Sequence, residues 1–321
     1  MEPHLPVELQ LHVLELASPP LTSTNFGSRR DLCKSLSLVH SAWTGTAQAA
    51  LNSVVELNIK DEELERAHLE RILQGVEEKD VRVDGVVLKE AFVWTPEGHP
   101  LWSNKPLLRV LRGITQLVLD NSAEEEHFPF PDEAFPNLRS LSVTSINGNA
   151  PIISPSTLTR LHLSGLNLFS LPAMPSLRTL ILHNPYFQDV VWVEEPFPIL
   201  RTFVWTAFEH SIDLQDSLPI LANAMPALKT LVFSLNFAFM AVNLPLFCNA
   251  LPSAPRTLTI RYPNDNSEPE YLEAGASWCL ENGVERVRVM YSREEKKYDY
   301  GYSRFLEVND NDPFDAEDYF S

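Results

Sequence analysis

The sequence predicts an α/β protein in which an N-terminal helical module, residues 1–52, precedes a solenoid of short parallel strands, residues 53–306. Three observations support this. A six-residue apolar pattern recurs through most of the chain, the first fifty or so residues show helical periodicity instead, and the copies of the pattern are unevenly spaced. The final segment, residues 307–321, is rich in acidic residues and contains no Lys or Arg, so we expect a disordered acidic tail.

The N-terminal module is predicted to contain three helices. The first covers residues 4–17, with Pro6 in its first turn. A loop of residues 18–30, which contains Pro, Ser and Thr, then interrupts the helical pattern. Two more helices are predicted at residues 31–43 and 46–51, and the last of them leads into the first strand.

Two segments of this module carry a family resemblance. Leu5-Pro6-Val7-Glu8-Leu9, with Val13-Leu14, resembles the start of an F-box, and the segment 36–43, LSLVHSAW, is similar to its second half. The chain departs from the family in its long 18–30 loop and in His40, where Cys is common. The resemblance covers about fifty residues. It implies that the module binds a Skp-family adaptor protein, which would connect the chain to a cullin–RING ubiquitin ligase, while the repeats bind a protein substrate.

The resemblance also implies which side chains face the adaptor: Leu5, Pro6, Leu9, Val13, Leu14, Leu38 and Val39. Trp43 is expected to pack inside the module or against the first repeat. In an alternative interpretation the helices only cap the open end of the solenoid, because a terminal repeat must be covered. The two interpretations are compatible, since a helix has two faces.

The recurring pattern is apolar-x-x-apolar-x-apolar, as in Leu138-Arg-Ser-Leu141-Ser-Val143. Its last two apolar residues point to the same side of a strand, so stacked copies bury them together against a parallel sheet. Spacings of 19 to 31 residues separate the middle apolar residues of ten copies: Leu57, Val86, Leu117, Leu141, Leu161, Leu180, Phe203, Leu231, Leu258 and Val287. Pattern and period are typical of leucine-rich repeats.

The spacing predicts what covers the convex side of the sheet. Long repeats have room for helices, and residues 62–74 and 270–282 show amphipathic periodicity. The short central repeats have room only for irregular or single-turn connections. With the N-terminal module, the arrangement is similar to the F-box and leucine-rich-repeat proteins of mushroom-forming fungi.

Residues that alternate with the buried positions are expected to line an exposed concave face. That face carries more basic than acidic residues, although the chain has a net charge of −18. A basic rim is predicted where a cation precedes a strand, at Arg139, Arg178, Arg201, Lys229 and Arg256. We hypothesise that the concave face or the basic rim binds an acidic segment, which belongs either to a substrate or to the chain's own tail. Alternatively, these cations pair locally with acidic loop residues.

The candidate substrate-binding residues combine this face with an aromatic loop at residues 186–192. They are Arg160, His162, His183, Arg261, Arg286, Arg288, Tyr186 and Trp192. The aromatic side chains are enriched at interfaces. In an alternative interpretation they fill the space in a repeat that is too short for a helix.

Several functional classes are not expected. No His, Ser or Gly pattern matches a known catalytic or phosphate-binding motif, so we expect no enzymatic activity and no cofactor. Cys33, Cys248 and Cys279 are too few and too distant for a zinc site or a disulfide framework, which favours a cytosolic or nuclear location. The acidic net charge argues against nucleic-acid binding, and neither a signal peptide nor a membrane-spanning segment is expected.

Overall fold

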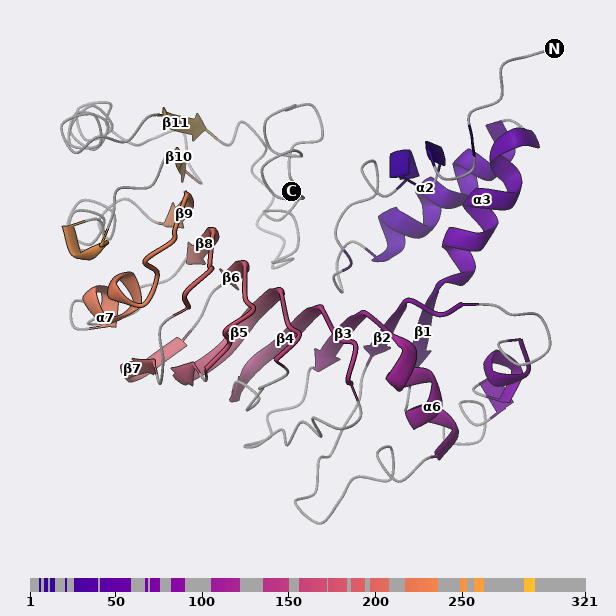
Figure 1. The fold of residues 1–321 in the computed structure, drawn as a ribbon, viewed down its shortest axis with the longest axis horizontal. Helices are drawn as coiled ribbons and strands as arrows, with labels where there is room; N and C mark the ends of the chain where they lie inside the picture. The colour runs from indigo at the N-terminus through magenta and orange to yellow at the C-terminus, as the bar shows by residue number, and fades with distance from the viewer. Residues whose placement is uncertain are drawn as a thin grey trace. The chain divides into compact units, whose positions relative to one another are not determined.

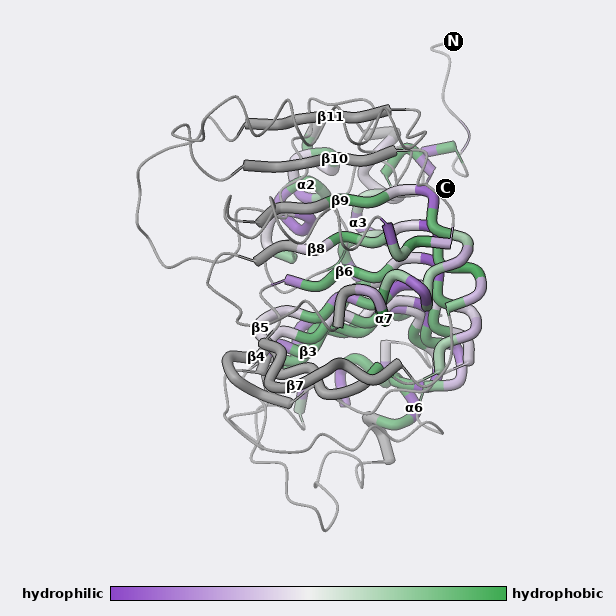
Figure 2. The backbone as a smooth tube through the Cα atoms, turned by 90° about the vertical axis from the view of Figure 1, so that its left-hand side faces the viewer, coloured by the Kyte–Doolittle hydropathy of each residue, from purple (hydrophilic) through white to green (hydrophobic). Residues whose placement is uncertain are grey.

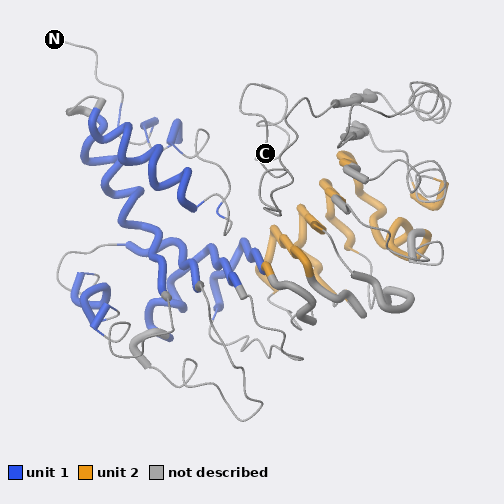
Figure 3. Tube along the Cα trace, turned by 180° about the vertical axis from the view of Figure 1, so that it is seen from behind, with its two compact units in different colours: residues 1–123, 133–143, 300–321 blue, residues 124–132, 144–299 orange. Residues whose placement is uncertain are grey.

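The computed structural model divides the chain into two compact units, coloured separately in Figure 3. Unit 1 comprises Met1–Ala123, Glu133–Val143 and Tyr300–Ser321, and unit 2 comprises Glu124–Asp132 and Thr144–Asp299. The structure describes residues 6, 9–10, 12–14, 21, 26–39, 41–58, 67–68, 70–75, 82–89, 105–121, 135–149, 156–171, 173–183, 186–193, 197–207, 217–235, 249–252, 257–262 and 286–291. The predicted acidic tail lies outside these residues.

Unit 1 contains the helices α2 (Phe26–Val39) and α3 (Ser41–Asn52), which pack against each other (Figure 1). Its strands are β1 (Val54–Asn58), β2 (Gly85–Lys89), β3 (Gln116–Asn121) and the first part of β4 (Ser140–Asn149), with helix α6 (Lys105–Gly113) between β2 and β3. The strand order follows the chain, and β1, β2 and β3 pair in parallel.

Unit 2 continues with strands of the same kind. They are β5 (Arg160–Leu171), β6 (Thr179–His183), β7 (Tyr186–Val193), β8 (Thr202–Ala207), β9 (Thr230–Leu235), β10 (Thr257–Tyr262) and β11 (Arg286–Tyr291), with helix α7 (Ser217–Asn223) before β9. The sheet order is β5-β6-β8-β9-β10-β11, and β7 pairs separately with β5. Figure 2 shows β6, β8 and β9 stacked side by side, with hydrophobic residues in the coloured part of each strand.

The predicted α/β class with parallel strands is confirmed, and the architecture is compatible with a repeat solenoid. Each of the ten marker residues of the apolar pattern lies in a strand. The apolar residues of the central copies are buried, for example Leu177, Leu180 and Leu182. Burying one such side chain stabilises the fold by about 1.5–3 kcal/mol. Strand β7 belongs to no copy of the pattern. It contains the aromatic segment 186–192, which was predicted to be a loop.

A tight turn precedes four of the strands. In each, a buried Phe or Met is followed by Pro, one further residue and a buried Leu, as in Phe197-Pro198-Ile199-Leu200. The amide of Leu200 donates to the carbonyl of Phe197 at 3.3 Å, which closes the turn. Pro fits the second position because its fixed φ suits the turn and the position needs no backbone donor. The other three turns begin at Phe135, Met174 and Met225.

A row of backbone carbonyls connects successive repeats just before their strands. The Arg178 carbonyl accepts hydrogen bonds from the amides of Arg201 and Thr202, at 2.8 and 3.0 Å, and the Arg201 carbonyl accepts from Lys229 and Thr230. Unit 1 repeats the arrangement from the carbonyls of Ser53, Asp84 and Thr115. Because each carbonyl uses both lone pairs, one residue per repeat fixes where the next strand begins.

The helix boundaries differ from those predicted. Helix α2 begins at Phe26, so the loop predicted at residues 18–30 ends earlier. Gly27 and Ser28 are poor helix formers and concealed this first turn. The predicted helix at residues 31–43 is divided after Val39, which places Trp43 in α3. Helix α6 was not predicted. Residues 67, 68 and 70–75 are helical, as expected, whereas residues 270–282 lie outside the described part.

In the part of the chain that the structure describes, helices are too short or too polar to cross a lipid bilayer.

A glycine with positive φ divides strand β5. Gly165 has φ 66° and separates residues 160–164, which pair with β6, from residues 167–171, which pair with β7. A side chain at this φ costs about 1–2 kcal/mol because Cβ approaches the following carbonyl. The glycine therefore permits one strand to take two partners.

We predict that Gly165→Ala lowers the free energy of unfolding by about 1–2 kcal/mol, measured by urea denaturation. Gly45→Ala is the matched control, because Gly45 lies in α3 and its added Cβ would meet open space. In a helix the same change is expected to stabilise by up to about 1 kcal/mol. Effects of the same sign in both variants would contradict the strain at Gly165.

Candidate protein-binding surface

The N-terminal helices have a small core of their own. Leu14, Cys33 and Ala47 are buried together, and Leu36 and Trp43 pack against them. Burial raises the pKa of the Cys33 thiol, which the nearby charge of Arg29 partly opposes. Leu14 was expected to face an adaptor, and this prediction is wrong, because its side chain faces the other helices. The expectation that Trp43 packs inside the module is confirmed.

Polar contacts fix the first helical segment and the start of the sheet. The hydroxyl of Thr46 in α3 donates to Oε1 of the buried Gln10 at 2.8 Å. At the end of α3, the amide of Ser53 donates to the carbonyl of Ala49. The Ser53 carbonyl then accepts from the amides of Asp84 and Gly85, so the end of the helix sets the register of β2.

Part of the module lies on the first strands rather than beyond them. Leu21 and Phe26 form a buried cluster with Val87 of β2 and Val118 of β3. Gly85 makes room for this packing, since a Cβ there would be 2.9 Å from Cδ2 of Leu21. The middle residues of these strands are therefore covered by the module.

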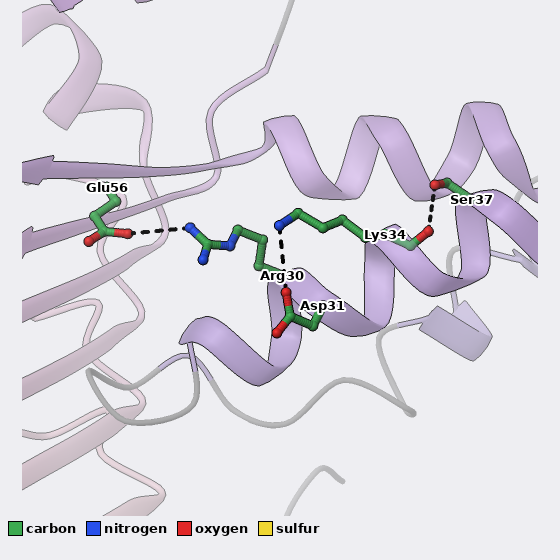
Figure 4. A network of polar contacts seen from close by, with 5 residues as sticks. All are labelled: Arg30, Asp31, Lys34, Ser37 and Glu56. Atoms are coloured by element: carbon green, nitrogen blue, oxygen red, sulfur yellow. Dashed lines mark hydrogen bonds and ion pairs between the residues drawn. The ribbon is translucent and has the colours of Figure 1, made fainter.

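Helix α2 also makes polar contacts, and Figure 4 shows Arg30 directed toward Glu56 and Lys34 toward Asp31. Nη1 of Arg30 lies 4.0 Å from Oε2 of Glu56 in β1, and its guanidinium lies 5.7 Å from the centroid of the Phe26 ring. On the same helix, Lys34 pairs with Asp31 at 3.6 Å. Exposed ion pairs contribute only about 0–1 kcal/mol, so these contacts add little to the stability of the fold.

Other apolar side chains of the module remain in solvent. Among the described residues, four large apolar side chains are exposed, and three of them belong to this module: Leu9 at 50%, Val13 at 45% and Leu38 at 86%. Leu9 and Val13 are four residues apart in a helical segment, so they share one face. Pro6 is also exposed. Leu5 and the side chain of Val39 lie outside the described part.

Strands β5, β6, β8 and β9 are buried on both sides where the structure describes their side chains, which corrects the prediction of an exposed concave face for these strands. His162 is 4% exposed and His183 2%, so neither is available to a substrate as expected. The equivalent middle residues Ile181, Val204 and Val232 are buried as well. The apolar character of these middle residues indicates burial on both faces already in the sequence, because strands buried on both faces have nearly continuous apolar runs.

Burial determines the chemistry of His162. Loss of solvent, with smaller contributions from His183 and Arg160, lowers its pKa from 6.5 to about 3. The imidazole is therefore neutral at physiological pH. The other candidate residues give less information. Arg160 is half-buried, and the side chains of Arg261, Arg286, Arg288, Tyr186 and Trp192 lie outside the described part.

The predicted rim, unlike the face, has exposed side chains where the structure describes them. Arg178, Arg201 and Lys229 are exposed directly before β6, β8 and β9, and Arg139 is exposed before β4 of unit 1. Arg256 lies outside the described residues. Trp205 of β8 is fully buried, with its ring centroid 6.2 Å from that of Phe203.

A comparison with models of known protein families and with curated protein sequences finds no match to this chain. The surfaces must therefore be interpreted from their own chemistry.

We predict that Gly85→Val destabilises the fold by about 1–3 kcal/mol, because the added methyl groups overpack against Leu21. Leu21→Ala also destabilises, but it opens space beside residue 85. In the double variant the loss should be clearly smaller than the sum of the two, measured by urea denaturation. Additive losses would show that Leu21 does not pack on Gly85.

We predict that His162 makes the fold sensitive to mild acid. Its folded pKa is about 3, whereas an unfolded histidine titrates near 6.5. For a base with a depressed folded pKa, the stabilisation is complete above pH 6.5 and is lost as the pH falls toward 3. Between pH 7 and pH 5 the loss from this group is about 2 kcal/mol. In His162→Val, urea denaturation should show a smaller loss over this range, and an equal loss would contradict the prediction.

Proposed function

We propose that this chain is a substrate-recognition adaptor of an SCF-type ubiquitin ligase. In this proposal the N-terminal module is an F-box that binds a Skp-family adaptor protein, and the strands form leucine-rich repeats that bind a protein substrate. The activity requires no catalytic group from this chain. A cytosolic or nuclear location belongs to the proposal, and the free buried thiol of Cys33 is compatible with it.

The supporting observation is the exposure of Leu9, Val13 and Leu38 in a module that buries Leu14, Cys33 and Ala47 in a core of its own. Complete burial of each would stabilise the protein by about 1.5–3 kcal/mol, and folding of this chain does not use that energy. An isolated exposed Leu is ordinary, but a concentration in one small module is typical of a protein-binding surface. These three positions are also among those that the F-box resemblance assigns to the adaptor.

The alternative function is a repeat scaffold whose N-terminal helices only cover the sheet. The packing of Leu21 and Phe26 on Val87 and Val118 favours a covering role for that part of the module. This packing uses different residues from the exposed ones. The module can therefore cover the first strands and still present Leu9, Val13 and Leu38 to a partner.

The proposal predicts that Leu38→Glu weakens binding to a purified Skp-family adaptor by at least about thirtyfold, the loss of one hot-spot residue. Isothermal titration calorimetry on the full chain provides the measurement. Because Leu38 is 86% exposed, the thermal unfolding midpoint should not change.

Ile199→Glu is the matched control, since Ile199 is an exposed apolar residue in the turn before β8. It should bind the adaptor like the original chain. Equal affinity of the Leu38→Glu and Ile199→Glu variants would contradict the assignment of the surface. If the unmodified chain does not bind the adaptor, the scaffold function is favoured.

A further inference from the structure

Unit 2 is acidic over its whole sequence, like the full chain with its net charge of −18, but its described strands and the residues directly before them are mostly basic. The one acidic residue at these positions is Asp189. The basic residues at these positions are Arg160, Arg178, Arg201, Lys229, Arg261, Arg286 and Arg288. The strands of this unit therefore form a basic framework in an acidic protein.

Three of these cations are fixed in a line. Arg178, Arg201 and Lys229, which we call the basic edge, each directly precede one of the adjacent strands β6, β8 and β9. Their backbones are hydrogen-bonded in sequence, from Lys229 to Arg201 and from Arg201 to Arg178, both at 2.8 Å. Each follows a buried Leu, so the backbone is anchored while the side chain is exposed.

This arrangement places like charges beside one another at the spacing of strands, about 4.7–4.9 Å. Like charges opposite each other in a sheet are destabilising. The carbonyl row needs no particular side chain at these positions, and the equivalent residues elsewhere in the row are Ser53, Asp84, Thr115 and Thr159. A run of three cations is therefore not a requirement of the fold, and an anionic ligand would relieve its repulsion.

We propose that the basic edge binds an extended acidic peptide segment of a partner protein. The three cations span about 10 Å across the strands, which equals three to four residues of extended chain. Two or three carboxylates in such a segment match the three charges. The buried middle residues, such as Ile181 and Val204, direct the ligand to this edge and not to the face of the sheet.

A short peptide fits better than a nucleic acid. A nucleic-acid strand carries a charge on each nucleotide, so the long-range field of a chain with net charge −18 repels it strongly. A few carboxylates experience less of this repulsion and gain contacts with the edge. This inference depends on the proposed function only in calling the partner a ubiquitination substrate, since the edge and the exposed Leu38 belong to different units.

The test is fluorescence anisotropy of the full chain with a labelled ten-residue peptide in which Glu alternates with Ser. We expect binding at low salt that weakens as ionic strength rises, and no binding of the same peptide with Gln in place of Glu. The variant Arg178→Gln/Arg201→Gln/Lys229→Gln should bind about tenfold more weakly, on the scale of three exposed ion pairs. The variant Arg178→Lys/Arg201→Lys should retain most of the affinity.

The control variant Lys34→Gln/Arg71→Gln/Arg112→Gln removes three exposed cations of unit 1 and changes the net charge equally. It should bind the peptide nearly as well as the original chain. Equal losses in both triple variants would overturn the proposal, as would tighter binding of an oligothymidine of similar length. If a chain ending at Leu306 binds the peptide more than tenfold tighter, and this gain is absent when Arg178, Arg201 and Lys229 are also replaced by Gln, the tail occupies the edge, which also overturns the proposal. The adaptor is absent from this assay, so its result is independent of the Leu38→Glu experiment.

Discussion

The sheet depends on a backbone interaction in which one carbonyl per repeat accepts two amides from the next repeat. In unit 1 this row runs through Ser53, Asp84 and Thr115, and in unit 2 through Thr159, Arg178 and Arg201. Each hydrogen bond contributes only about 1 kcal/mol net, but the pair determines where the next strand begins. A shift of one residue would turn the buried leucines to the opposite face, so the apolar pattern and the carbonyl row must agree.

The strand positions were predictable from the sequence because the apolar pattern reports burial on the inner side of each strand. Leu161 and Leu163 are examples, and both are buried. The state of the other side was not predicted. His162 is polar and alternates with leucines, which suggests a solvated position, yet it is buried. Alternation within one strand describes that strand alone, whereas burial of its second face depends on distant segments.

For the candidate surfaces too, the sequence indicates which residues are apolar but not which of them are buried. The exposure of Leu9, Val13 and Leu38 agrees with the residues that the family resemblance suggested, but Leu14 does not, because helical periodicity places several apolar residues around the first segment without distinguishing its two sides. Packing decides between them. Cys33 and Ala47 cover Leu14, and Leu21 and Phe26 lie against the strands, so the module has one side for its own fold and another for solvent.

The residues before the strands also have a consequence for how such a protein diverges. Their backbone atoms maintain the register, whereas side chains such as Arg178 and Arg201 point into solvent. Substitutions in this row can reverse the charge of a whole edge without moving a strand. Mutation at a few positions thus changes the surface charge, while selection for folding acts on the leucines beside them. A duplicated copy of this gene would have a short route to a differently charged surface on the same fold.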